Sequence, residues 1–511
     1  MRLSRTLNTK RNIFFGLIWR LYITAVPFII RTIFIYVLGV AYLGLDSLFT
    51  SILNVLSLAE LGVGNALVFH MYKAIATDDK EKICQLMAFY KKCYRIIGFI
   101  VLAIGLCFLP FLKYLIKSDL PADVNLYVLY LIQLAATVVT YWLFAYKNCL
   151  LSAHQRNDLV SKVNIVVMTI QYILQIILLL LARKYYFYIV IVPLVNIFKN
   201  IATSFVVDKV YPQYRPQGKI SEELKKDIFK RMKALLFSKI GAMIVASSDT
   251  MVITSFLGLS VAGIYSNYHY IMTAVIGFIT IIFDSMTAGV GNSLELETPQ
   301  KNYNDFKKIS FVNDWIIMWC TVCLLCLYQP FINLWVGKDY LFGVSTVVLL
   351  SCFFYFWKSN NVMLMYKDAG GLWYEDRFRP LIVGLANIIL DIVLVRIWGV
   401  NGIVFASALV YVAIAIPWLF ANVHKYIFKN SPKEMIVRFI LNVLITAVLA
   451  ALTYCLCSLI RFNEDIKLYQ WLTLGVRFAI CLVVPNSIYF LLHVKSKEMR
   501  GLLSKLRRKN G

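Results

Sequence analysis

Apolar stretches long enough to cross a lipid bilayer recur along the whole chain. A helix needs about 20 apolar residues to cross about 30 Å of hydrocarbon. Of the 511 residues, 60% are hydrophobic and the mean hydropathy is +0.71, which is more apolar surface than a soluble core buries. The ten-residue alternation of a membrane β-barrel is absent, so the sequence predicts an all-α polytopic membrane protein. Fourteen stretches qualify as spans, at roughly 13–41, 48–72, 94–116, 125–151, 158–182, 185–208, 235–258, 261–290, 309–335, 342–366, 378–398, 401–424, 434–460 and 468–494.

The positive charge of the chain is distributed unevenly between its loops. The net charge is +25, from 52 Lys and Arg against 27 Asp and Glu. When the N-terminus is placed in the cytoplasm, most of the Lys and Arg residues fall in cytoplasmic segments, and the opposite orientation reverses this bias. We therefore expect both termini to be cytoplasmic. The basic excess then reflects topology and affinity for anionic membrane lipids rather than binding of nucleic acid.

One sequence pattern occurs twice. A Leu-Gly-Leu triplet, a short uncharged corner and a helix rich in small and hydroxyl residues appear around Gly44 and again around Gly258. Such self-similarity indicates a duplicated architecture. Because an even number of spans separates the copies, they have the same orientation, and transporters built from parallel repeats bind substrate at the repeat interface.

A basic amphipathic segment, SEELKKDIFKRMKALL, interrupts the apolar spans near the middle of the chain. A helix of this kind lies on the membrane surface, so we take it as the boundary between two halves. The expected organisation is an N-terminal six-helix bundle at 1–208, a cytoplasmic linker with the amphipathic helix at 209–234, a C-terminal six-helix bundle at 235–425, and two extra transmembrane helices with a basic cytoplasmic tail at 426–511.

Cationic and amide side chains interrupt several spans. Arg31 lies near the middle of the first span, whereas Arg20 lies nearer its cytoplasmic end and can snorkel. A charge inside the membrane is costly unless it faces protein or a water-filled cavity. We therefore predict that Arg31, Arg20 and Lys358 line a substrate-binding cavity together with Asn54 and Asn360. Helix–helix hydrogen bonding is the alternative role for the amides.

Three carboxylates also lie within or beside apolar runs, namely Glu60, Asp249 and Asp284. A buried carboxylate can bind a proton or a sodium ion, or it can brace neighbouring helices by pairing with a cation such as Arg31. Both roles, coupling and helix bracing, remain open from the sequence.

Cysteine usage and enzyme motifs give no sign of a cofactor. Cys320, Cys323 and Cys326 follow one helix at three-residue spacing, but no His or carboxylate accompanies them, so we expect apolar packing and no metal site. Walker, Rossmann, zincin and nucleophile-elbow motifs are absent from the sequence. The predicted outer connections are short, the longest at roughly 460–468. We therefore expect a protein that is not an enzyme and needs no cofactor.

Several motifs in order along the chain resemble a known family. They are the early Leu-Gly-Leu with Asp46, then Leu-Ala-Glu-Leu-Gly62, Asp249 followed by Phe-Leu-Gly-Leu and Gly263-Ile-Tyr-Ser266, and finally Ala369-Gly-Gly371 with Trp398-Gly-Val-Asn-Gly402. Together they resemble bacterial Wzx-type polysaccharide flippases of the multidrug/oligosaccharidyl-lipid/polysaccharide (MOP) exporter superfamily.

This resemblance implies two pseudo-symmetric, MATE-like six-helix bundles around a central cavity, with two further C-terminal helices. It implies a flippase that carries undecaprenyl-diphosphate-linked oligosaccharide repeat units of O-antigen or capsule to the outer leaflet. Arg31 matches an Arg in the first span of related lipid flippases, and a guanidinium suits phosphate. Asp249 matches a recurrent acidic position of the family. One departure is Arg183, which stands where a Gly-x-x-Gly turn would be expected before the sixth span.

The expected setting is the bacterial cell membrane. Anionic lipids, a polysaccharide polymerase and other assembly proteins are the candidate partners, and proton or sodium coupling is left open. Three alternatives also remain open from the sequence. They are a peptidoglycan lipid-precursor flippase, a MATE-type antiporter and, from another class, a membrane polysaccharide polymerase or ligase. Cationic cavity residues argue against an antiporter for organic cations, and short outer loops argue against a polymerase.

Overall fold

The computed structural model describes residues 5–56, 63–117, 120–154, 156–460 and 466–501, and these are predominantly helical, with no β-strand among them. Within these ranges, twelve helices are long and apolar enough to cross a membrane, and two shorter apolar helices, Val40–Leu56 and Leu126–Trp142, overlap two further predicted spans. The prediction of an all-α polytopic fold is therefore confirmed. The chain forms two compact units, Met1–Ser266 and Asn267–Gly511, while the domain boundaries expected from the sequence stay predictions.

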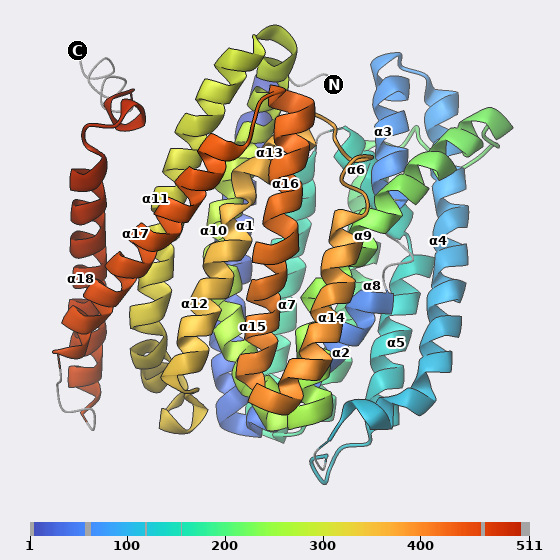
Figure 1. Ribbon diagram of the computed structural model, residues 1–511. Coiled ribbons are helices and arrows are strands. Elements are labelled where there is room, and N and C mark those ends of the chain that lie inside the picture. Colours follow the sequence, from blue (N-terminus) through green and yellow to red (C-terminus); the bar gives the residue numbers. More distant parts are fainter. Residues whose placement is uncertain (1–4, 57–62, 118–119, 155, 461–465, 502–511) are drawn as a thin grey trace. The chain divides into compact units, whose positions relative to one another are not determined.

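Unit 1 contains the helices of the first 266 residues (Figure 1). Within it, α1 packs on α7, α7 and α5 pack on α8, and α2 packs on α9. Its elements are α1 (Arg5–Leu38), α2 (Val40–Leu56), α3 (Val63–Ala76), α4 (Lys80–Phe108), η2 (Leu109–Leu115), α5 (Leu126–Trp142), η3 (Ala145–Lys147), α6 (Asn148–Ala153), α7 (Asn157–Ala182), α8 (Tyr185–Val210), α9 (Glu222–Leu257) and the start of α10 (Leu259–Leu296).

Unit 2 begins within α10 and includes the two helices that follow the second bundle. Both of these, α17 and α18, pack on α11 and on each other, while α12 packs on α11 and α15. Its elements are the rest of α10, α11 (Pro299–Val336), η4 (Lys338–Tyr340), α12 (Val344–Ser359), α13 (Asn361–Ala369), α14 (Arg379–Trp398), α15 (Val400–Val410), η5 (Tyr411–Ala415), α16 (Ile416–Val423), η6 (His424–Phe428), α17 (Lys433–Ser458) and α18 (Lys467–His493).

Three predicted helix boundaries differ from the structure. The span expected at 48–72 covers the end of α2 and most of α3, with undescribed residues between these helices. The amphipathic segment forms the first part of α9 and continues without a break into its apolar part. This helix starts at an N-cap, where Ser221 Oγ accepts from Leu224 N. The span expected at 125–151 ends at Trp142, because Phe144 adopts a left-handed conformation (φ 54°). The short η3 that follows ends in Lys147, whose ammonium lies 2.6 Å from Asp208 and donates to Ser204 Oγ at 2.7 Å.

The helix breaks reveal the register of the internal repeat. Gly39 separates α1 from α2 with φ 97°, and Gly258 separates α9 from α10 with φ 96°. Glycine tolerates this region, which other residues avoid. The structural equivalent of Gly258 is therefore Gly39 rather than Gly44, which lies inside α2. The register expected from the two Leu-Gly-Leu triplets is wrong.

Unit 1 supports this corrected register with a reciprocal contact. A Cβ on Gly44 would lie 1.9 Å from the carbonyl oxygen of Leu259, and a Cβ on Gly263 would lie 2.2 Å from that of Val40. The sequence offset from Gly39 to Gly258 also relates Val40 to Leu259 and Gly44 to Gly263. Two small residues thus let the main chains of α2 and α10 approach closely, in a locally two-fold arrangement.

The turns that end α7 and α14 differ in backbone form. Arg183 ends α7 in the left-handed helical region, at φ 51° and ψ 31°, whereas Gly399 ends α14 at φ 58° and ψ −133°. Glycine adopts this second conformation readily because it has no side chain. A left-handed conformation costs a residue with a side chain roughly 1–2 kcal/mol, so the chain ends α7 with an arginine at an energetic cost.

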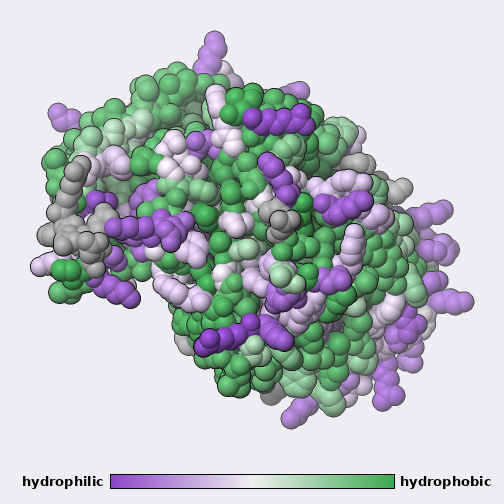
Figure 2. All heavy atoms as spheres, turned by 90° about the horizontal axis from the view of Figure 1, so that it is seen from below, coloured by the Kyte–Doolittle hydropathy of each residue, from purple (hydrophilic) through white to green (hydrophobic). Residues whose placement is uncertain are grey.

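Large apolar side chains cover the outer faces of helices in both units. Leu181 and Phe205 in unit 1 are 79% and 72% exposed, and Val448 and Leu491 in unit 2 are 66% and 67% exposed. Apolar side chains make up much of the surface seen in Figure 2. Helices with such faces are stable in hydrocarbon, so this is a multi-pass membrane protein.

We predict that Gly44→Ala and Gly263→Ala each destabilise the protein. The added methyl group would collide with backbone, so the loss should reach or exceed the ~1–3 kcal/mol typical of overpacking. Thermal unfolding of detergent-purified variants, followed by size-exclusion chromatography, measures it. Gly289→Ala is the control, because a Cβ added there would meet no described atom within 4 Å. Equal melting temperatures for all three variants would contradict the close crossing.

Candidate functional site

Arg31 lies on α1 beside the beginning of α10. Its Nη2 donates a hydrogen bond to Ser266 Oγ, which in turn donates to the carbonyl oxygen of Gly263 at 2.8 Å. The guanidinium also interacts electrostatically with the carboxylate of Asp46 on α2. A cation that is hydrogen-bonded and has a carboxylate nearby costs less in an apolar environment than an isolated one. Arg31 is therefore held where α1, α2 and α10 meet.

Tyrosines from α8 complete this polar cluster. The hydroxyl of Tyr185 donates to Asp46 Oδ1 at 3.3 Å, and Tyr188 lies within electrostatic range of both Asp46 and Arg31. The ring of Phe34 contacts both tyrosine rings edge-on, at centroid distances of 6.0 and 4.8 Å. The cluster thus combines one cation, one carboxylate and phenols. Sequence analysis did not select Asp46 as a site residue, although a carboxylate in an apolar helix after Arg31 was a visible signal.

Asp249 on α9 is 8% exposed and is held by hydroxyl groups. Tyr265 donates to its Oδ2 at 2.8 Å, and Ser248 Oγ lies 3.5 Å from its Oδ1. Tyr265 immediately precedes Ser266, the partner of Arg31. The same turn of α10 therefore positions both Asp249 and Arg31, and the two roles expected for Asp249, coupling and helix bracing, stay predictions.

The structure describes less of the surroundings of three other predicted residues of unit 1. Asn54 is exposed on α2. Arg20 belongs to α1, but its side chain lies outside the described residues, and Glu60 lies outside them entirely.

In unit 2 the structure brings Lys358 and Asp284 into electrostatic range of each other. Lys358 is 7% exposed near the end of α12, with its Nζ 5.4 Å from the ring centroid of Trp357, whereas Asp284 on α10 is exposed. Among the described residues, Lys358 has no carboxylate within 4 Å of its Nζ. A buried ammonium without a close ion pair is suited to an anionic ligand.

Asn360 lies at the junction of α12 and α13 and is 1% exposed. Its Nδ2 donates to the carbonyl oxygen of Phe356 at 3.2 Å, while its Oδ1 has no partner among the described residues. The neighbouring Asn361 donates to Asn313 Oδ1 at 3.5 Å. The kink between the helices thus carries amide groups, of which the oxygen of Asn360 is available to a donor.

A further buried carboxylate, Asp391 on α14, was not selected from the sequence. It is 0% exposed, and its Oδ2 accepts from Asn387 Nδ2 at 2.6 Å. Ser407 on α15 donates to Asn387 Oδ1 at 3.2 Å. Carboxylate, amide and hydroxyl oxygens are groups that bind a proton or a hard cation. The signal was available, since Asp391 interrupts the apolar run of 378–398.

A second polar contact missed by sequence analysis joins α17 to α11. Asn442 Nδ2 donates to Asp314 Oδ2 at 2.7 Å, Arg438 lies 3.8 Å from the same oxygen, and Arg438 also donates to Glu498 at 3.0 Å. These charges pair with one another, which indicates attachment of α17 rather than substrate binding.

Helices of membrane-spanning length with cations and carboxylates inside apolar runs are typical of a multi-pass membrane transporter. The model of the family described as polysaccharide biosynthesis protein matches residues 9–286, more than half of the chain. The chain belongs to this family. Among curated protein sequences, none gives a significant match.

Solved structures show the same fold. The lipid II flippase MurJ in its inward closed conformation superimposes with a TM-score of 0.65 at 17% identity, covering 95% of this chain and 99% of MurJ. An inward-facing multidrug resistance MATE transporter of the MOP superfamily gives 0.61 at 15% identity, covering 81% and 98%. A Vibrio cholerae MATE transporter gives 0.57 at 13% identity, covering 83% and 99%. The predicted polysaccharide-biosynthesis family and the MATE-like fold are confirmed.

We predict that Arg31 and Asp46 are energetically coupled. Arg31→Met and Asp46→Asn should each destabilise the protein, and the double variant should lose less than the sum of the two, with a coupling of roughly 0.5–3 kcal/mol. Unfolding in mixed detergent micelles measures the three losses. The control cycle combines Arg31→Met with Glu223→Gln, since Glu223 is exposed at the start of α9. Additive losses at Arg31 and Asp46 would rule out the pair.

Proposed function

We propose that this protein is a flippase that moves undecaprenyl-diphosphate-linked oligosaccharide repeat units of a surface polysaccharide, such as O-antigen or capsule, from the cytoplasmic to the outer leaflet. The observation that carries the proposal is a guanidinium held inside the membrane span of a polysaccharide-biosynthesis family member. A lipid-linked diphosphate is an anion that such a cation can bind from within the bilayer.

Arg31 is the proposed diphosphate ligand. Its guanidinium donates a hydrogen bond to Ser266 and interacts electrostatically with Asp46, and the described cluster contains no second cation. A diphosphate offers two anionic oxygens in a geometry that a guanidinium fork matches. Exchange of Asp46 for the diphosphate keeps Arg31 paired throughout. Protonation of Asp46 would assist this exchange, which offers one way to link transport to a proton gradient.

Lys358 and the amides supply the proposed contacts to sugars and to further negative charge. The buried ammonium of Lys358 beside Trp357 suits an acidic sugar or phosphate, and the Trp357 ring suits the apolar face of a sugar. Asn360 and Asn54 are proposed to hydrogen-bond sugar hydroxyl groups. Arg20 is proposed as a cation nearer the cytoplasmic end of α1.

Transport is proposed to proceed by alternating access, in which the ligand binds the two states differently. Asp249, Asp284 and Glu60 are candidates for proton or sodium coupling, and Asp391 with Asn387 and Ser407 joins them because all three are buried. The protein is proposed to act in the bacterial cell membrane with both termini in the cytoplasm. Its basic segments would contact anionic lipids, and a polysaccharide polymerase and other assembly proteins would consume its product.

The test is deletion of the gene in its host, followed by a sidedness assay of lipid-linked oligosaccharides. Completed repeat units should accumulate on the inner leaflet. Accumulation of peptidoglycan precursor there would favour the precursor flippase, which the likeness to MurJ keeps as the second candidate. Loss of drug efflux alone would favour the MATE-type antiporter. Single repeat units on the outer face would favour a polymerase or ligase and refute the proposal.

Arg31→Ala should abolish surface polysaccharide in the complemented deletion strain while the protein remains in the membrane. Charge-assisted hydrogen bonds contribute ~1.5–3 kcal/mol each, so we expect a fall of at least tenfold, and Arg31→Lys should restore only part of it. Surface polysaccharide is quantified by gel and protein by immunoblot. Arg215→Ala is the matched control, because Arg215 is exposed between α8 and α9. Normal polysaccharide in Arg31→Ala would remove Arg31 from the site.

Asp391→Asn should uncouple transport from an ion gradient if Asp391 carries the ion. The amide preserves size but cannot be protonated or neutralise a cation. Flipping of labelled lipid-linked oligosaccharide in proteoliposomes, with a proton or sodium gradient and with ionophores, measures the dependence. Wild type should respond to one gradient and Asp391→Asn to neither, with Glu223→Gln as control. An unchanged response in Asp391→Asn would place coupling elsewhere.

A further inference from the structure

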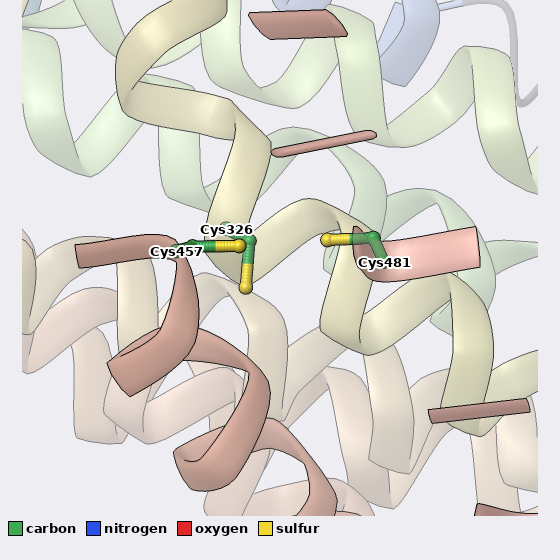
Figure 3. Close-up of side chains that lie close together, drawn as sticks. All are labelled: Cys326, Cys457 and Cys481. Carbon is green, nitrogen blue, oxygen red and sulfur yellow. The ribbon is translucent and has the colours of Figure 1, made fainter. Parts of the chain in front are cut away.

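Three buried cysteine thiols from three different helices meet in unit 2. Cys326 on α11, Cys457 on α17 and Cys481 on α18 are 2%, 1% and 0% exposed. Their sulfur atoms all lie within 4.8 Å of one another. Figure 3 shows the side chain of Cys481 directed toward those of Cys326 and Cys457. Sequence analysis considered only the three cysteines within α11, of which one belongs to this group.

The packing of the C-terminal helices creates this convergence. The same apolar cluster contains Phe311, Met318 and Val322 of α11 and Leu449 of α17. Trp319 donates to the carbonyl oxygen of Cys481 at 3.1 Å, which fixes α18 against α11. The side chains around the three thiols are apolar, so the thiol sulfurs are the atoms of this cluster that can bind a metal ion.

The spacing fits a single metal ion. Metal–thiolate bonds are about 2.3 Å long, so three sulfurs around one ion in a plane lie about 4 Å apart. The observed limit of 4.8 Å allows this with small side-chain movements. Soft thiolate ligands without nitrogen or oxygen donors select Cu(I), zinc and iron–sulfur clusters. Zinc almost always takes four ligands, so a set of three thiols favours Cu(I).

Charge and access also suit a thiophilic cation. Arg477, one turn before Cys481 on α18, interacts electrostatically with both Cys457 and Cys481. If Cu⁺ displaces two protons from the three thiols, the site carries one negative charge, which the guanidinium offsets. Cys320 and Cys323 line a neighbouring cavity of about 600 Å³. The cavity therefore reaches Cys323, which lies about one helical turn from Cys326 on α11.

We propose that Cys326, Cys457 and Cys481 form a three-coordinate site for one Cu(I) ion, which ties α17 and α18 to α11. Binding involves no redox step, since Cu(I) enters and leaves in the same oxidation state and the two displaced protons pass to solvent. The site is independent of the proposed lipid substrate.

The test is Cu(I) binding to the full-length protein in detergent under anaerobic conditions, in competition with a chromophoric Cu(I) chelator. Wild type should retain one equivalent, and X-ray absorption should report three sulfur neighbours. Cys326→Ala, Cys457→Ala and Cys481→Ala should each lower the affinity more than about a hundredfold, beyond the 10–100-fold typical of changes around a metal ligand. Cys455→Ala is the control, because Cys455 is exposed on α17.

Each contrary result has a defined meaning. Equal Cu(I) affinity in wild type and Cys481→Ala, or no retained copper, would overturn the site. Tighter binding of Zn(II) with four sulfur neighbours would overturn the assignment to Cu(I) and implicate Cys323. A disulfide between two of the three cysteines in anaerobically prepared protein would replace the metal site by a covalent link. The copper stoichiometry and the X-ray absorption measurement use wild type alone, so they decide the matter even where a variant fails to fold.

Discussion

The close crossing of α2 and α10 at Gly44 and Gly263 fixes the geometry on which the Arg31 cluster depends. Each glycine faces a carbonyl oxygen of the other helix at a distance that excludes any side chain. Ser266 lies one turn beyond Gly263 and accepts the hydrogen bond of Arg31, while Asp46 follows Gly44 on the other helix. Because neither glycine has a side chain, the two helices cross closely enough to place Ser266 and Asp46 near Arg31.

The same crossing relates the repeat to the proposed mechanism. Gly39 and Gly258 break the chain at equivalent points, and the contacts between the two segments are reciprocal. A locally two-fold contact made of main chain has few side-chain interactions to exchange. Rotation of α2 against the start of α10 would therefore change the distance between Arg31 and Asp46.

Sequence alone predicts the properties that depend on local composition. Membrane-spanning segments are such a property, because hydropathy over about 20 residues decides insertion, and Arg31 and Asp249 stand out for the same reason. The repeat register was wrong, because the identical triplets at Gly44 and Gly258 suggest one pairing, whereas the backbone angles pair Gly258 with Gly39. Other contacts depend on how the helices pack, which residue spacing within one helix does not reveal. Examples are the interaction of Arg31 with Asp46 and the contact of Cys326 with Cys457 and Cys481.

The two C-terminal helices are attached to α11 by interactions of different kinds. Asp314 accepts from Asn442 of α17, and Asn486 of α18 accepts from Trp315 at 2.8 Å, so directional hydrogen bonds fix both helices at one part of α11. Further along α11, apolar contacts and the three thiols replace them. Apolar contacts permit sliding, whereas hydrogen bonds define one register. Trp319 keeps one hydrogen bond in this second region, to the carbonyl oxygen of Cys481 on α18. A metal ion at the thiols would add a directional contact to α17, so that α11, α17 and α18 would share one fixed register.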